Sequence, residues 1–235
     1  MRLIYLFFIS AFLSALTTCC FAQEVNKVSD TVSTKAETFG LRLGIDLSKP
    51  IRTLIDENYT GFEIMADFRV YKKFYVAIEL GNEEKDLFEE NLNSSTSGSY
   101  AKIGIDFDAN KNWIGLHNNI IIGMRYGISS FKQNLISYGV FTTNQTFTES
   151  QFREDAIEFD GLSAQWVELI FGIKTELFDN FYLSLHLELK QLLNEDLPTN
   201  FDNLYIPGFN KTNDHSDIGV GYGYSISYLI PLFKK

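Results

Sequence analysis

The stretch FYLSLHLELK, residues 181–190, alternates between apolar and polar side chains without interruption. Its odd-numbered residues are Phe and Leu, and its even-numbered residues are Tyr, Ser, His, Glu and Lys. Successive side chains of a β-strand point to opposite faces, so the pattern predicts a strand with one apolar and one polar face. A soluble strand hides its apolar face, whereas a transmembrane barrel turns that face toward lipid. The class of the protein therefore depends on which face lies inside.

The same period of two recurs along the chain, and no stretch shows the sustained 3.6-residue period of a helix. We expect eight strands, within residues 39–48, 60–70, 74–81, 99–108, 119–129, 165–177, 181–190 and 217–230. An even number of strands, each about ten residues long, is what tilted crossings of an outer membrane require. The repetition favours one all-β domain.

The predicted connections alternate between short and long. Residues 71–73 and 178–180 form short links, and DANKNWIGLHN forms a link of moderate length. We expect long loops at 49–60, 82–98, 132–161 and 191–216. Outer-membrane barrels have tight periplasmic turns and longer outward loops, so the long loops are predicted on the cell exterior.

The N-terminus is interpreted as an export signal, residues 1–22, with a charged Arg2, an apolar run and a small-residue cleavage site after Ala22. The apolar run is short for a transmembrane anchor, and Thr18 before Cys19 fits a lipoprotein signal poorly. Residues 23–36 are polar and aperiodic, as expected of a flexible periplasmic leader, and residues 37–235 form the barrel domain. Both cysteines lie in the signal, so the mature chain is predicted to have no disulfide.

The number of apolar side chains indicates which face lies outside. The apolar faces of the strands carry about forty side chains, far more than the interior of an eight-stranded barrel can hold. The polar faces combine small residues and Tyr with charges of both signs, which suit a narrow lumen. Aromatic residues near the strand ends suit the membrane interfaces, for example Phe74 and Tyr228 at the periplasmic rim and Phe62 and Tyr100 at the outer rim.

We therefore predict an all-β protein, an eight-stranded antiparallel up-and-down transmembrane β-barrel with its leucines facing lipid. The alternative fold is a secreted soluble β-sandwich of two four-stranded sheets, which could bury many of the same side chains between its layers. A sandwich would show mixed connection lengths and polar residues on some of the apolar faces.

Charged side chains of the polar faces are predicted to meet in the lumen. Desolvated charges need partners, so we expect an ion-pair network that rigidifies the barrel and blocks flow. The alternative is a path for protons or small ions. The predicted network consists of Arg42, Asp46, Glu63, Asp67, Arg69, Glu79, Lys102, Asp106, Arg125, Glu168, Lys174, Glu176, His186, Glu188 and Lys190.

Ser184, His186 and Glu188 resemble a hydrolase triad written along one strand. Alternate residues of a strand stand about 6.5–7 Å apart, which is too far for a nucleophile and its base. We therefore expect a hydrogen-bonded His186 in the lumen and predict no catalytic residue, no cofactor and no metal site. The segments 214–217 and 83–90, which could attract cations, are expected to be a solvated loop and a charged rim.

Two predicted loops are rich in aromatic residues. These side chains either pack together and cap the barrel, which is the favoured reading, or form a patch for a partner. The candidate loop contacts are Tyr138, Phe141, Phe147, Phe201, Tyr205 and Phe209.

Several runs carry a resemblance to a known family: GLRLGIDLSKPIR, YTGFEI, LGNEEK, MRYGISSF, NLYIPGFN and YSISYLIPLFKK. They are similar to small outer-membrane proteins of Bacteroidota grouped as domain of unknown function 6048, and the general shape resembles OmpX, OmpA and PorT-like barrels. The resemblance spans the mature chain and implies a barrel in the outer membrane, without any activity or catalytic residue. The C-terminal Lys234–Lys235 departs from the aromatic last residue of many such barrels.

The formal net charge of −10 argues against nucleic-acid binding. We expect an integral outer-membrane protein that is not an enzyme and has a structural or interaction role in the cell envelope. Its expected partners are outer-membrane lipids and another envelope protein, reached through the extracellular loops. The alternatives are a lipid-modifying hydrolase or acyltransferase and a narrow small-solute pore.

Overall fold

The chain divides into two units, Met1–Ala36 and Glu37–Lys235. The computed structural model describes residues 38–109, 118–139, 152–153, 155–211 and 216–234, all in the second unit. The predicted export signal and leader, and the candidate contacts Phe141 and Phe147, lie outside the described residues.

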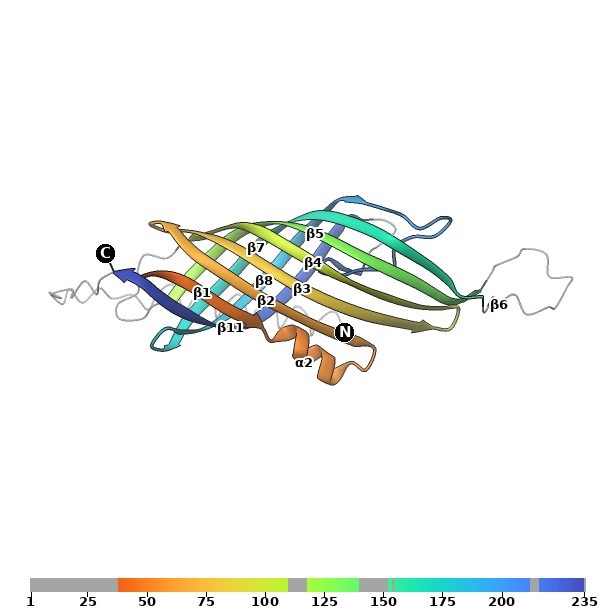
Figure 1. Cartoon of the computed structure of the whole chain (residues 1–235), viewed down its shortest axis with the longest axis horizontal. Helices are drawn as coiled ribbons and strands as arrows, with labels where there is room; N and C mark the ends of the chain where they lie inside the picture. The colour runs from red at the N-terminus through yellow and green to blue at the C-terminus, as the bar shows by residue number, and fades with distance from the viewer. Residues whose placement is uncertain (1–37, 110–117, 140–151, 154, 212–215, 235) are drawn as a thin grey trace, which may run out of the picture. The chain divides into compact units, whose positions relative to one another are not determined.

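Eight long antiparallel strands form a closed ring within the described residues (Figure 1). They are β1 (Thr38–Asp46), β2 (Tyr59–Tyr71), β3 (Phe74–Glu89), β4 (Leu92–Asp108), β5 (Asn118–Gly139), β7 (Ile157–Phe178), β8 (Phe181–Glu195) and β11 (Ile218–Lys234). Each strand pairs with its neighbour in sequence, β4 pairs with β5, and β1 pairs with β11 to close the ring. The predicted eight-stranded up-and-down β-barrel is confirmed.

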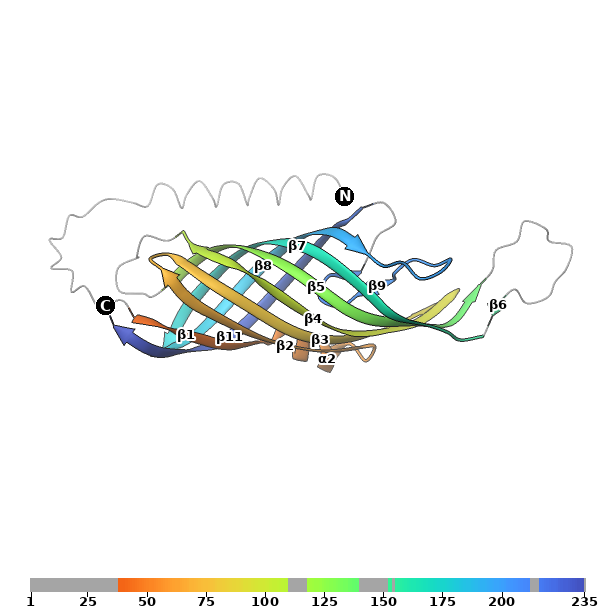
Figure 2. The ribbon, with the colours of Figure 1, turned by 45° about the horizontal axis from the view of Figure 1, so that its top comes forward.

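Two-residue turns join β2 to β3 and β7 to β8, as predicted. Lys72 and Asn180 adopt positive φ angles of 41° and 65° in these turns, which is the backbone twist that tight hairpins between right-twisted strands require. At the other end of the barrel, the strands extend to different lengths. Figure 2 shows β3, β4, β5 and β7 running on together toward β6 (Phe152–Arg153), well past the end of β1.

The predicted long loops are largely wrong in their boundaries. Residues 82–98 continue β3 and β4 around a short turn at Glu90 and Asn91, and β5, β7 and β8 also extend into the predicted loops. Residues 49–60 contain helix α2 (Ser48–Ile55) and the start of β2, and 191–216 contain the short pair β9 (Tyr205–Ile206) and β10 (Asn210–Lys211). Apolar alternation stops where both faces of a strand leave the lipid, although the backbone pairing continues. No helix among the described residues is long and apolar enough to cross a membrane.

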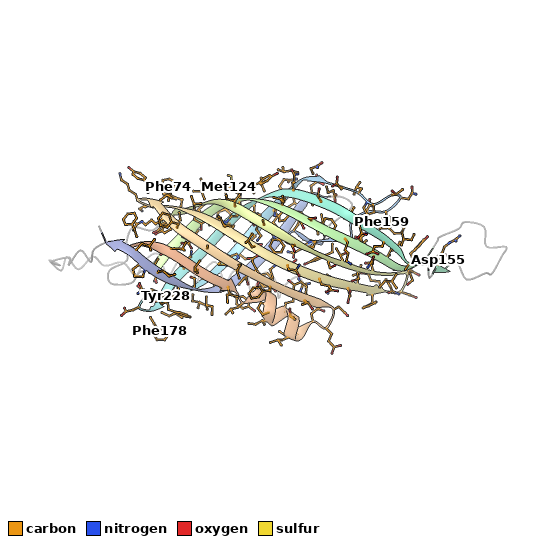
Figure 3. The ribbon with its side chains drawn as sticks, viewed as in Figure 1. Phe74, Met124, Asp155, Phe159, Phe178 and Tyr228 are labelled. Carbon is orange, nitrogen blue, oxygen red and sulfur yellow. The ribbon has the colours of Figure 1, made fainter. Side chains whose placement is uncertain are left out.

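The apolar faces point outward. On β8, Leu185 and Leu187 are 57% and 61% exposed, whereas Glu188 and Lys190 are 6% and 2% exposed. This is the reverse of a soluble sandwich and identifies the outer surface as the one that meets lipid. Figure 3 shows Phe74, Phe178 and Tyr228 projecting outward near the end with the tight turns, as expected of rim aromatics.

One rim assignment is wrong. Tyr100 is buried, at 4% exposure, and points into the barrel, whereas Phe62 is exposed as predicted. Tyr100 lies one residue before Ala101 and three before Ile103, which belong to the outward face, so the alternation itself assigns it to the lumen.

The outward orientation predicts the effect of a charge at the middle of β8. Leu187→Arg should destabilise the barrel folded in a bilayer by about 2–4 kcal/mol, because the guanidinium would enter hydrocarbon. Thr60→Arg, on the exposed start of β2, should cost about 0–1 kcal/mol because it lies near the interface. Urea titrations of both variants in lipid vesicles measure the difference. Equal stabilities would contradict the orientation.

Candidate functional site

The centre of the lumen is organised around Lys102 of β4. Its ammonium lies 3.4 Å from Glu63, 3.1 Å from Glu79, 3.6 Å from Glu168 and 3.7 Å from Glu188. These carboxylates come from β2, β3, β7 and β8, so one cation joins strands on opposite sides of the ring. All five side chains are at most 9% exposed.

Further ion pairs extend the network along the tube. Arg125 contacts Glu79 at 2.9 Å and Asp106 at 2.7 Å. Lys190 contacts Glu188 at 2.9 Å and Glu168 at 3.6 Å. Charge-assisted contacts of this kind offset the cost of desolvating the partners only when every member is paired, so the network favours one fixed arrangement.

Arg42 and Lys174 share Asp67 on the side of this network that lies toward the two-residue turns. Their nitrogens lie 3.2 and 2.7 Å from the carboxylate oxygens. The Arg42 guanidinium also lies 4.6 Å from the ring centre of Tyr182, within the range of a cation–π contact.

Three further members of the predicted network make local contacts with the backbone. Arg69 donates to the carbonyl of Lys72, and the Glu176 carboxylate accepts the Asn180 amide at 2.8 Å, so both stabilise the two-residue turns. Asp46 accepts the Ser48 amide at 2.5 Å, where β1 ends.

His186 is in the lumen, where its Nε2 lies 3.2 Å from a carboxylate oxygen of Glu188. The expectation that alternate side chains cannot meet is therefore wrong for this pair, because both side chains lean toward each other along the strand. The Ser184 hydroxyl is buried and has no hydrogen-bond partner among the described residues. It lines a cavity of about 50 Å³, together with Asp67, Lys174 and His186. The cavity has room for a few water molecules.

The mouth of the tube opposite the two-residue turns is filled by the segment from Asn203 to Asn210, which the sequence NLYIPGFN encodes. Glu83 of β3 is fully buried and holds this segment, since it accepts the Tyr205 hydroxyl at 2.5 Å and the Gly208 amide at 3.0 Å. Lys190, from the network in the lumen, donates to the Gly208 carbonyl at 2.6 Å. Burial, and then the Glu83 carboxylate, raise the pKa of Tyr205 well above its ordinary value.

Apolar packing completes this cap. The rings of Trp166 and Phe209 lie edge-on, with their centres 6.0 Å apart. Both residues are almost fully buried, as are Ile206 and Phe131. Tyr205 and Phe209 therefore cap the barrel and are not available to a partner, which corrects their assignment as candidate loop contacts. The rings of Tyr138 and Phe201 lie edge-on with their centres 5.4 Å apart, and both residues remain partly exposed.

The sequence reading missed two parts of the site, Lys49 and Glu83. Lys49 lies in a segment predicted as a loop, and Glu83 lies in a run predicted as an exposed acidic rim. The signal that could have identified Glu83 is its parity with Glu79, four residues earlier on the inward face of the same strand. No group of three His, Cys, Asp or Glu side chains in the described part of the chain could hold a metal ion.

The position of Lys102 predicts a large stability effect. Lys102→Met should destabilise the folded barrel by about 3–5 kcal/mol, because four buried carboxylates would lose their shared cation. Lys132→Met is the control, since its pair with Glu158 is half exposed and should be worth about 0–1 kcal/mol. Denaturant titration followed by the gel mobility of the folded form provides the measurement. A Lys102→Met barrel as stable as the control would contradict a network that supports the fold.

Gly208 predicts a local effect on the cap. Its φ is 83°, and a Cβ there would lie 2.6 Å from the Tyr100 ring. Gly208→Ala should therefore raise hydrogen exchange across residues 203–211. Gly161→Ala, with a φ of 71° and nothing within 4 Å, is the control for backbone strain alone, which costs about 1–2 kcal/mol. Unchanged exchange in Gly208→Ala would show that the cap is not packed against Tyr100.

Among solved structures, the attachment invasion locus protein Ail of Yersinia pestis is 12% identical, with a TM-score of 0.41 over 82% of this chain and 95% of that one. A major outer-membrane protein of Thermus thermophilus is 13% identical, with a TM-score of 0.40 over 82% of this chain and 98% of that one. No curated protein sequence matches the chain. The family described as domain of unknown function DUF6048 matches residues 4–235, so the chain belongs to that family.

Proposed function

We propose that this chain is a closed outer-membrane barrel that serves as a structural or interaction protein of the cell envelope. The observation that carries the proposal is the filled tube: Lys102 and its four carboxylates occupy the centre, and the Tyr205–Gly208 segment occupies the mouth. An eight-stranded barrel packed in this way leaves little space for a solute. The proposed function therefore depends on the outer surfaces of the barrel.

The proposed location rests on three features. The barrel exposes a continuous apolar surface, aromatic residues gather at one rim, and the sequence predicts an export signal. A closed ring also leaves few backbone groups unpaired in hydrocarbon, which is the condition for spanning a bilayer with strands.

The proposed contact surface is the part of β3, β4, β5 and β7 that continues past the lipid-facing band. Its outward side chains on β3 are polar or acidic up to the tip, where Phe88 is 59% exposed. Tyr138 of β5 and Phe201, two residues before the cap, supply a partly exposed aromatic pair nearby. Exposed aromatic residues within a polar surface are typical of binding sites for a protein or for surface lipid.

The closed lumen predicts an absence of conductance. Purified protein in planar bilayers should give no steady single-channel steps, because the ion pairs and the cap leave no continuous water path. Steady steps whose size changes in Arg125→Ala or Glu168→Ala would establish a pore through the network instead.

The proposed contact surface is tested by a photo-reactive amino acid at Phe88 in intact cells. We expect a covalent adduct with an envelope protein or with outer-leaflet lipid. The same amino acid at Tyr205, which is 6% exposed, is the control and should give no adduct. Failure of the Phe88 position to react, or equal reaction at both positions, would contradict the proposed surface.

A further inference from the structure

The barrel wall is incomplete on one side because β1 is short. Its pairing with β11 ends at Asp46 and Ser225, and its pairing with β2 ends at Asp46 and Glu63. Residues 59–62 of β2 and 218–224 of β11 continue beyond that level without a β1 partner. The chain fills this place with helix α2, which Figure 1 shows standing off the wall beside β2.

On the β11 side the gap lies within the lipid-facing band, and on the β2 side, at residues 59–62, it reaches the edge of that band. Val220 and Tyr222 of β11 point outward with 67% and 73% exposure, and they pair with Leu189 and Leu187 of β8. Unpaired backbone groups of a strand edge cost several kcal/mol each in hydrocarbon, so an open gap at this level is unfavourable. Whatever covers it stabilises the barrel.

Helix α2 satisfies part of the β2 edge. The Thr53 hydroxyl accepts the Gly61 amide at 2.9 Å, and the carbonyl of Asp56 accepts the Tyr59 amide at 3.0 Å. At the other edge, the Leu47 amide donates to the Tyr224 carbonyl at 2.8 Å. The helix and its two ends thus take the place of the missing part of β1.

Lys49 fixes the helix from inside. Its ammonium passes through the gap, pairs with the buried Glu83 carboxylate and lies 5.9 Å from the centre of the Tyr100 ring. Burial alone would lower the pKa of Lys49, but Glu83 outweighs it and raises the pKa above its ordinary value. Because the pKa of Lys49 is higher in the folded chain, its contribution to stability is present at neutral pH and is lost as the pH rises through the folded pKa.

The opposite face of α2 is apolar and uncovered. Ile51, Leu54 and Ile55 have the i, i+3, i+4 spacing of one helix face, and their exposures are 37%, 85% and 78%. Lys49 and Thr53 lie on the face toward the barrel. A helix that turns its polar stripe to the protein and its apolar stripe outward has the polarity expected of a helix that lies in lipid.

We propose that α2 covers a lateral gap in the barrel wall and binds the acyl chains of outer-leaflet lipid through Ile51, Leu54 and Ile55. The occupant is identified by continuity, since the helix packs against β2 and β11, whose outward residues Phe62, Ile64 and Val220 belong to the lipid-facing surface. The proposal rests on the proposed membrane location.

The test places an environment-sensitive bimane label at Leu54 in a full-length chain carrying Cys19→Ser and Cys20→Ser, reconstituted in phosphatidylcholine vesicles. Brominated phosphatidylcholine reports contact with lipid, and iodide reports contact with water. A label at Leu187 is the control for the barrel itself, and a label at the exposed Glu57, just past the helix, is the control for water. We expect Leu54 to be quenched several-fold more by the brominated lipid than by iodide, and Glu57 to show the reverse.

The controls separate the two proposals. Lipid quenching at Leu187 but iodide quenching at Leu54 would overturn the α2 inference and leave the membrane location standing. Protection of Leu54 from both quenchers would also overturn it, because a protein partner or a second copy would then cover the helix. Iodide quenching at Leu187 would contradict the membrane location itself.

A second measurement tests, independently of the label, whether α2 covers the gap. Lys49→Met removes the lumenal pair and should raise hydrogen exchange in residues 59–62 and 218–224 by at least tenfold. Lys132→Met removes the same charge from the half-exposed pair with Glu158, away from α2 and Glu83, and it should leave that exchange within twofold of the unchanged chain. Equal exchange in the two variants would contradict the role of Lys49.

Discussion

The structure depends on one constraint: backbone N–H and C=O groups in hydrocarbon must be paired within the protein. Closure of β1 onto β11 satisfies this condition for most of the ring and gives every strand one face toward lipid and one toward a narrow lumen. The alternation in residues 181–190 is the local consequence, with Leu185 outside and Glu188 inside. The alternation along each strand of the closed ring therefore determines which side chains face the interior.

Closure of the ring also places polar and charged side chains in the interior, where they need partners. A tube of eight strands cannot hold the large apolar side chains that face outward, and polar residues placed inside must find partners without bulk water. Lys102 meets four carboxylates from four strands, and Glu83 ties the helix, the cap and β3 together. These contacts fix the relative positions of strands that do not pair directly. The lumen is therefore the polar counterpart of a hydrophobic core.

The sequence predicts the barrel and the orientation of its strands because a period of two and a surplus of leucines are strong local signals. It also identifies the lumenal charges, since each lies on the polar face of an alternating strand. The loop boundaries fail where Glu, Ser and Asn occupy both faces of β3 and β4 outside the lipid band. The roles of Lys49 and Tyr205 could not be predicted, because both reach Glu83 from segments without periodicity, and only the folded chain brings them together.

The most direct test of the inverted arrangement is methyl NMR of the protein in lipid nanodiscs containing a doxyl-labelled lipid. The account predicts strong broadening of the Leu185 and Leu187 methyl signals and none for Ala77 and Ala164, which are 4% and 1% exposed and face the interior. Broadening of the alanine methyls, with sharp signals from the two leucines, would contradict the assignment of the apolar face to lipid.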